Sequence, residues 1–191
     1  MIEVRIHGRG GQGVVIASKI LVAAAVAEGK HANSIPDFTF ERRGAPVKAF
    51  VRISDEYIFE KTQVYHPDIL VVFDLKLKTI VNFYEGIKEN CTLVVNSPDI
   101  ISFPEKIKTI GYIDANKIVA PFFGIPVVNT CMLGAFAKTT RIISLESLIY
   151  GINEILENVS DEALERNIRF AEEGFNQTKI VKKGDKQYEK L

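Results

Sequence analysis

Residues 2–28 decide the fold class: Ile2-Glu3-Val4-Arg5-Ile6-His7, then Gly8-Arg9-Gly10-Gly11-Gln12-Gly13, then an apolar run that opens at Val14. In the first segment apolar residues alternate with Glu3 and Arg5, which is typical of a β-strand. The glycines predict a tight turn, and residues 14–28 predict a helix that Gly29 ends. A strand that feeds a helix through a glycine-rich turn is typical of α/β domains.

The next segments extend this unit into a mixed sheet. Residues 69–73 and 92–95 are continuous apolar runs, typical of strands buried on both faces. Residues 47–53 alternate, with Lys48 and Arg52 on a solvent-facing side, which favours an antiparallel strand. Further strands are expected at 31–35 and 106–112, and a long loop at 36–46.

Helices are expected in the remaining segments. The helix over 14–28 is apolar nearly all round, so we expect it to be buried on more than one side, within the domain or against a partner. Further helices are expected over 76–84, from Asp114 to Pro121 and over about 131–140. Two amphipathic stretches, 145–156 and 164–175, predict two more helices. Ser144 is the expected N-cap of the first, and either Ser160 or Asp161 is that of the second. We therefore predict one three-layer α/β/α domain over residues 1–178. It has a mixed, mostly parallel sheet with an antiparallel pair and C-terminal helices. A charged C-terminal tail, 179–191, is frayed or docked on a partner.

Composition excludes several functional classes. The 191 residues hold 24 Lys+Arg and 24 Asp+Glu, and this zero net charge argues against nucleic-acid binding. Cys91 and Cys131 are too few for an iron–sulfur cluster, and the three histidines have no ligand-like spacing with them. We expect reduced thiols and no metal site. The chain has no basic leader or apolar run long enough for a membrane span, so we expect a cytoplasmic protein without membrane contact.

The turn at Gly8–Gly13 fits the G-x-G-x-x-G pattern of dinucleotide-binding loops. Two features weaken that interpretation. Arg9 and Gln12 are long polar residues beside the turn, and no acidic residue ends the strand at 31–35. Three interpretations stay open: a dinucleotide site, a site for another phosphate or carboxylate, and a structural turn. A Walker loop is excluded because no Gly-Lys-Ser/Thr follows.

A second motif is Glu41-Arg42-Arg43-Gly44-Ala45-Pro46. It is either a solvated charged loop or an arginine fork for a phosphate or carboxylate. Elsewhere His7 is interpreted as a hydrogen-bonded structural histidine, His66 as a surface turn residue and Cys131 as core. No nucleophile elbow or carboxylate dyad is present. If the chain belongs to an enzyme, we expect other chains to carry the chemistry.

Taken together, three segments resemble the gamma subunit of 2-oxoacid:ferredoxin oxidoreductases. They are Ile6–Gly13, Glu41–Pro46 with the following Ala49-Phe50, and Asn129-Thr130-Cys131-Met132-Leu133-Gly134-Ala135. The resemblance covers about residues 2–175. The sequence is most similar to the pyruvate or branched-chain type, since the 2-oxoglutarate branch has Glu-Met-Arg-Gly-Gly where this chain has Glu41–Ala45.

The resemblance implies a complex that oxidatively decarboxylates a 2-oxoacid with CoA to acyl-CoA and CO2, and reduces ferredoxin. It implies catalytic alpha and beta subunits and a ferredoxin-like delta subunit. Thiamine diphosphate, Mg and 4Fe–4S clusters are expected on those subunits, with no cofactor and no catalytic residue on this chain. The candidate contacts to CoA phosphates or to other subunits are Gly8, Arg9, Gly10, Gly11, Gln12, Gly13, Arg42 and Arg43. The alternatives are a free-standing dinucleotide-dependent oxidoreductase and an interaction protein whose glycine loop is structural.

Overall fold

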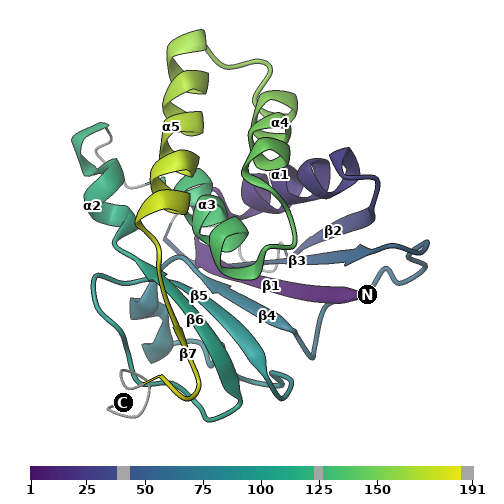
Figure 1. Cartoon of the computed structure of the whole chain (residues 1–191), viewed down its shortest axis with the longest axis vertical. Helices are drawn as coiled ribbons and strands as arrows, with labels where there is room; N and C mark the ends of the chain where they lie inside the picture. The colour runs from purple at the N-terminus through teal and green to yellow at the C-terminus, as the bar shows by residue number, and fades with distance from the viewer. Residues whose placement is uncertain (38–43, 123–126, 186–191) are drawn as a thin grey trace.

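The computed structural model describes residues 1–37, 44–122 and 127–185. The strands of these residues form one mixed sheet in the order β2-β3-β1-β4-β5-β6-β7 (Figure 1). They are β1 (Ile2–Arg9), β2 (His31–Asp37), β3 (Pro46–Ser54), β4 (Ile69–Val72), β5 (Cys91–Asn96), β6 (Ile107–Ile113) and β7 (Lys179–Lys182). The helices are α1 (Val14–Ala27), α2 (Ala115–Val119), α3 (Asn129–Thr140), α4 (Leu145–Ile155) and α5 (Asp161–Gln177), with short 3-10 helices η1 (Leu75–Thr79) and η2 (Ala120–Phe122).

The strand pairing confirms the predicted α/β class. The central strands β1, β4, β5 and β6 run parallel to one another, and the apolar runs of β4 and β5 lie inside the sheet. Antiparallel pairing is more extensive than the one predicted pair. β3 lies antiparallel between β1 and β2, and β7 lies antiparallel to β6.

The segment that was predicted to open the charged tail is part of the sheet. Residues Lys179–Lys182 form β7, which pairs with Thr109–Tyr112 of β6. Val181 is buried in the core there, so apolar burial holds a segment whose lysines had indicated a solvated end. Residues 186–191 of the predicted tail lie outside the described residues.

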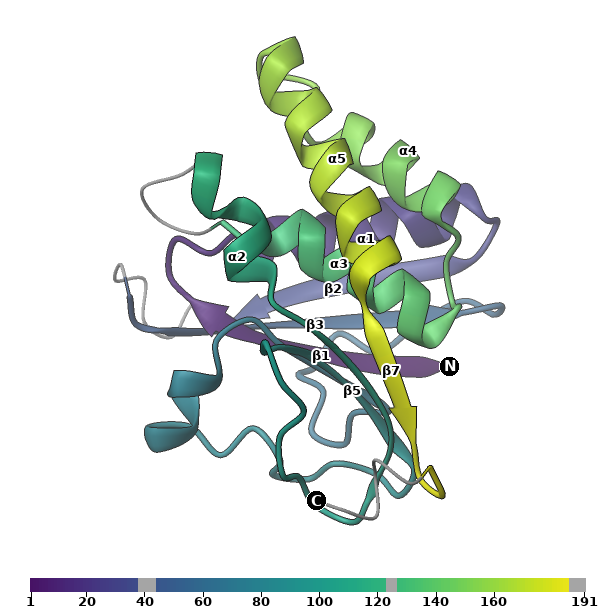
Figure 2. The ribbon, with the colours of Figure 1, turned by 60° about the vertical axis from the view of Figure 1, so that its left-hand side comes forward.

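Helices α1, α3, α4 and α5 cover one face of the sheet (Figures 1 and 2). Helix α1 packs on β1 and β3 with one side and on α4 with another, as its apolar sequence predicted. The expected cap at Ser144 is confirmed, and of the two alternatives for the next helix, Ser160 rather than Asp161 is the N-cap. The Oγ atom of Ser144 accepts a hydrogen bond from the Ser147 amide at 3.0 Å, and that of Ser160 accepts one from Ala163 at 3.3 Å.

The other face is covered by η1 and connecting segments, and the predicted helix over 76–84 is wrong beyond Thr79. Arg5 of β1 explains the difference. Its Nη2 atom donates to the carbonyl oxygens of Phe83 at 2.9 Å and Glu85 at 2.7 Å. The Phe83 side chain is buried in the core on this face, together with Leu77. These contacts hold the segment in a non-helical path.

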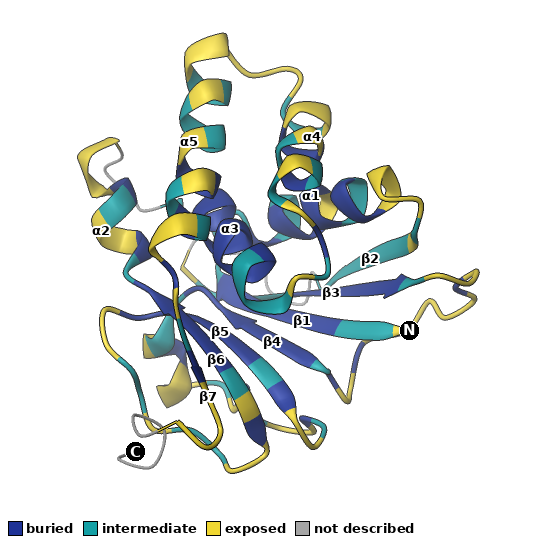
Figure 3. Ribbon diagram, viewed as in Figure 1, coloured by how far each residue is buried: buried dark blue, intermediate teal, exposed yellow. Residues whose placement is uncertain are grey.

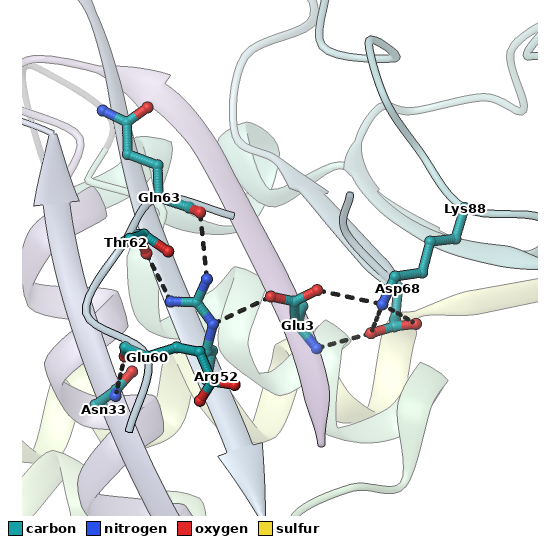
Figure 4. Close-up of polar contacts among 8 residues, drawn as sticks. All are labelled: Glu3, Asn33, Arg52, Glu60, Thr62, Gln63, Asp68 and Lys88. Carbon is teal, nitrogen blue, oxygen red and sulfur yellow. Dashed lines mark hydrogen bonds and ion pairs between the residues drawn. The ribbon is translucent and has the colours of Figure 1, made fainter. Parts of the chain in front are cut away.

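Arg52 of β3 lies on this second face, and its predicted exposure to solvent is wrong. The side chain is buried, at 3% exposure. Its guanidinium donates to the Thr62 carbonyl at 2.6 Å, the Gln63 carbonyl at 3.2 Å and Glu3 Oε1 at 3.1 Å (Figure 4). The segment after β3 folds back over the strand and covers it. These three hydrogen bonds, donated by Nε, Nη1 and Nη2, offset the free-energy cost of burying the charged guanidinium.

His7 of β1 is buried near Arg5, at 3% exposure. Its ring packs edge-on against Phe83, with the centroids 5.7 Å apart. The structural role is as predicted, but Nε2 has no hydrogen-bond partner within the described residues. Burial, with smaller contributions from the nearby charges of Arg5 and Lys48, lowers the pKa of His7 to about 3.

The first prediction concerns the contact between α3 and α5. Gly174 of α5 faces the carbonyl oxygen of Cys131 in α3 so closely that an added Cβ would clash with backbone. We expect Gly174→Ala to lower the free energy of unfolding by about 1–3 kcal/mol, although alanine is the better helix former. Urea titration measures this change. Glu172→Ala, exposed on the same helix, is the control and should change stability by less than about 0.5 kcal/mol. Equal stability of the two variants would contradict the close packing.

The second prediction concerns acid stability. His7 is neutral in the folded chain down to about pH 3, whereas an unfolded histidine takes up a proton near pH 6.5. The unfolded state therefore binds more protons below pH 6.5, and stability falls as the pH falls. We expect His7 to account for about 2 kcal/mol of lost stability between pH 7 and pH 5, where carboxylates scarcely titrate.

The measurement is the free energy of unfolding at several pH values for wild type and His7→Gln. The variant should lose most of the slope between pH 7 and pH 5, whatever its absolute stability. His31→Gln, at an exposed position of β2, is the matched control and should keep the wild-type slope. An unchanged slope in His7→Gln would show that His7 is not the group responsible.

Candidate functional site at the glycine loop

The glycine loop lies at the carboxyl edge of the parallel strands, where α/β proteins place their ligand sites. It follows β1 and leads directly into α1, whose N-cap is Gly13 in the left-handed conformation, with φ of 77°. Asp74 follows β4, and Asn96 ends β5 at the same edge. In the sequence Asp74 and Asn96 mark only the ends of strands, and no local pattern signals that they meet at this edge.

Three of the loop's amides donate hydrogen bonds within the chain. The Arg9 amide donates to Gln12 Oε1 at 2.8 Å, and the Gln12 amide donates to the Arg9 carbonyl at 3.0 Å. The Gly10 amide donates to the Ala45 carbonyl at 2.9 Å. In a dinucleotide site the backbone amides of this turn face the pyrophosphate. Here the folded-back Gln12 side chain takes part of that role, which disfavours the free-standing dinucleotide enzyme.

Arg9 connects the loop to its surroundings. Its Nε atom donates to Asp74 Oδ2 at 2.6 Å, and its Nη1 atom donates to the Gly44 carbonyl at 3.0 Å. The other oxygen of Asp74, Oδ1, accepts from the Lys76 amide and caps η1. Arg9 is thus committed to bonds within the chain, and it fixes the loop against β4, η1 and the second motif.

The second motif lies beside the glycine loop. In the β1–β3 pairing Arg9 stands opposite Pro46, and beyond it the Gly44 amide donates to the Gly10 carbonyl at 3.1 Å. Glu41, Arg42 and Arg43 lie outside the described residues. Motifs more than thirty residues apart in the sequence therefore meet at one edge. One sequence signal bears on this meeting. The alternation of residues 47–53 predicts an antiparallel strand, and pairing of that strand with β1 brings the two motifs together.

The third family segment also reaches the loop. Asn129 opens α3, and its side chain packs against Gly13 so closely that a Cβ at Gly13 would touch the Asn129 amide nitrogen. Its Oδ1 atom accepts a hydrogen bond from the Thr130 amide at 2.9 Å. The segment is recognisable in the sequence, but its contact with the loop has no local signal. The described parts of all three segments that carry the resemblance thus converge on the turn between β1 and α1.

A neighbouring polar contact braces the same edge. Asn96 is buried, and its Nδ2 atom donates to the Phe73 carbonyl at 2.9 Å while its Oδ1 atom accepts from the Ala115 amide at 3.0 Å. It therefore ties the end of β4 to the start of α2. Together with Arg9 and Asp74, it makes the edge rigid from β1 to β6.

The histidine and the two cysteines that are candidate reactive groups, His7, Cys91 and Cys131, are buried and unreactive. His7 is buried and neutral. Cys91 and Cys131 are buried, and burial raises the pKa of both thiols to about 12, which makes them poor nucleophiles. Within the described ranges no group of three or more His, Cys, Asp or Glu side chains is placed to hold a metal ion. The helices of those ranges include none that is long and apolar enough to cross a membrane.

Comparison with known proteins agrees with the motif set. Residues 3–177 match the family model described as pyruvate ferredoxin/flavodoxin oxidoreductase. The gamma subunit of the NADH-dependent phenylglyoxylate dehydrogenase of Aromatoleum evansii is 45% identical over 183 residues, which cover 94% of this chain and 95% of that one. The common gamma subunit of the pyruvate/ketoisovalerate oxidoreductases of Thermococcus kodakarensis is 42% identical, with 94% and 98% covered.

A solved structure gives the same result. The pyruvate oxidoreductase subunit PORC of Thermotoga maritima superposes with a TM-score of 0.79 at 33% identity, and the match covers 95% of this chain and 98% of that chain. Sequence and fold thus agree over nearly the whole length of both proteins. The chain belongs to the pyruvate ferredoxin/flavodoxin oxidoreductase family.

Proposed function

We propose that this chain is the gamma subunit of a complex that oxidatively decarboxylates a 2-oxoacid with CoA and passes the electrons to ferredoxin. The observation that carries the proposal is the near full-length match to gamma subunits of the family. The isolated chain is inactive, because its thiols and His7 are buried away from any substrate. Two free, buried cysteines are typical of a reducing compartment, which supports a cytoplasmic location.

We assign the cofactors to the partner subunits. A 4Fe–4S cluster needs about four thiolates, and this chain has two cysteines, on separate elements. Thiamine diphosphate, Mg and the clusters are therefore placed on catalytic alpha and beta subunits and a ferredoxin-like delta subunit. When bound there, thiamine diphosphate supplies the carbanion chemistry that decarboxylation of a 2-oxoacid requires. The contribution of this chain is to hold those subunits or the CoA in position.

The substrate is a 2-oxoacid, with pyruvate as the leading candidate. The names of the relatives include pyruvate, ketoisovalerate and phenylglyoxylate, which differ in the group attached to the oxo acid. One of those gamma subunits is named as common to two substrates, so we infer that other chains select the substituent. The Glu41–Ala45 sequence favours pyruvate over 2-oxoglutarate.

The third prediction is that this chain, tagged at its native locus and purified without oxygen, co-elutes with the thiamine- and cluster-bearing subunits. The eluate should oxidise pyruvate only when CoA is present, with ferredoxin as the acceptor. Ketoisovalerate, phenylglyoxylate and 2-oxoglutarate in parallel assays identify the substrate, and NAD⁺ in place of ferredoxin tests the acceptor. If this chain elutes alone, without any other subunit detected by mass spectrometry, the proposal is overturned.

We propose a further role for the two motifs at the carboxyl edge. CoA carries phosphates, and arginine pairs favour bidentate binding of phosphate. Arg9 is engaged by Asp74 and Gly44, so Arg42 and Arg43 are the arginines of these motifs that we assign to the CoA phosphates. Within the glycine loop, Gly11 and Gly13 offer amides that donate to no acceptor in the described part of the chain. Gly8, Gly10 and Gln12 shape the loop.

The fourth prediction tests this role. In the assembled complex, Arg42→Glu combined with Arg43→Glu should raise the KM for CoA by about tenfold or more, because charged hydrogen bonds are lost and repulsion is added. The KM for the 2-oxoacid should change little. Lys106→Glu with Lys108→Glu, exposed at the opposite edge of the sheet, is the matched control. An intact complex with an unchanged KM for CoA would disprove the assignment.

A further inference from the structure

The segment that follows β3 is largely exposed (Figure 3), and it carries two neighbouring exposed aromatic residues, Tyr57 and Phe59. Tyr57 is 65% exposed and Phe59 is 79% exposed. Their rings meet edge to face with centroids 4.8 Å apart, and Tyr57 meets the His31 ring of β2 at 5.8 Å. Single exposed apolar residues are ordinary, but contiguous exposed aromatic rings are typical of binding surfaces.

Buried contacts hold this segment in place although it forms no helix or strand. Ile58 and Val64 point into the protein and are buried. The Arg52 guanidinium holds the carbonyl oxygens of Thr62 and Gln63, and Asn33 Nδ2 donates to the Glu60 carbonyl at 3.1 Å (Figure 4). The aromatic pair is thus presented in a fixed geometry. Pre-organisation of this kind lowers the entropy cost of binding a partner.

Carboxylates surround the aromatic pair. Tyr57 and Phe59 line a hollow of about 450 Å³ together with Asp55, Glu56 and Glu60, beside Met1. Residues 54–66 hold three carboxylates against one ammonium group, that of Lys61, and the α-amino group of Met1 makes the count three to two. This net negative charge favours a positively charged partner over a second copy of the same surface.

An arginine side chain fits both features of the hollow. Its planar guanidinium stacks on aromatic rings and binds carboxylates with two parallel hydrogen bonds. The aromatic rings and their acidic neighbours therefore favour an arginine-bearing segment as the partner. A hydrophobic segment without positive charge would leave the carboxylates without an ion-pair partner in the interface.

We propose that Asp55, Glu56, Tyr57, Phe59 and Glu60 form a docking patch for an arginine-bearing segment of a catalytic subunit of the complex. The inference rests on the proposed function, since it identifies where a partner subunit binds. The patch lies beside the amino end of β1, whereas the glycine loop lies at the carboxyl end of the same strand.

The fifth prediction compares variants in the whole complex. The affinity for the alpha and beta subunits should fall by about tenfold or more in Tyr57→Ser/Phe59→Ser and also in Asp55→Lys/Glu56→Lys. Melting temperatures of the variants should match wild type, because all four side chains are exposed. Tyr150→Ser on α4 and Glu162→Lys/Glu165→Lys on α5 are matched exposed controls that should keep wild-type affinity.

A photo-reactive phenylalanine analogue at position 59 identifies the occupant by mass spectrometry of the cross-linked peptide. A cross-link to an arginine-bearing segment of alpha or beta supports the proposal. Cross-links between two copies of this chain, or folded patch variants with wild-type affinity for the other subunits, overturn it. If the wild-type chain does not assemble with thiamine- and cluster-bearing subunits, the proposed function itself fails, so the two failures are distinguishable.

Discussion

The two buried guanidinium groups of β1 and β3 hold the second face of the sheet together. Arg5 binds the carbonyls of Phe83 and Glu85, and Arg52 binds those of Thr62 and Gln63. Four helices cover the other face, whereas irregular segments cover this one. Irregular backbone needs partners for its carbonyl groups when it is buried, and the arginines provide them. The path of the segment after η1 and the fixed position of the segment after β3 both depend on these contacts.

The glycine loop shows how a binding motif can serve packing. Gly13 permits the close approach of Asn129, the Arg9 amide binds the Gln12 side chain, and Gly10 joins the turn before β3. In an accessory subunit this arrangement is reasonable, because a rigid edge positions whatever the neighbouring motif or subunit binds. The pattern G-x-G-x-x-G, taken alone, predicts a dinucleotide site. In this chain the groups that would bind the pyrophosphate are partly engaged by Gln12 and Ala45, so the same pattern serves packing.

Much of the fold follows from local pattern in the sequence. Alternation predicted the strand 47–53, apolar runs predicted β4 and β5, and Ser144 and Ser160 predicted helix starts, because each signal depends on residues close in the chain. The errors arise from distant contacts. The carbonyls that Arg5 holds lie about eighty residues further along the chain, so the loss of helix after Thr79 has no local signal. Arg52 is buried because an irregular segment folds back over its strand and because Glu3 of the neighbouring strand binds it, and the alternation of residues 47–53 signals neither contact. For the same reason the motifs of the candidate site were found, but their convergence was not.

The two surfaces to which we assign roles lie at opposite ends of β1. That strand has eight residues, so the glycine loop and the aromatic–acidic patch are separated by about 26 Å. A partner docked on the proposed patch would therefore leave the carboxyl edge, the proposed CoA site, uncovered. Because Arg52 and Arg9 anchor the two regions through separate contacts, weakening one does not release the other. The two proposed roles therefore predict separable defects, because variants of the patch would lower subunit affinity and variants of the carboxyl edge would lower CoA affinity.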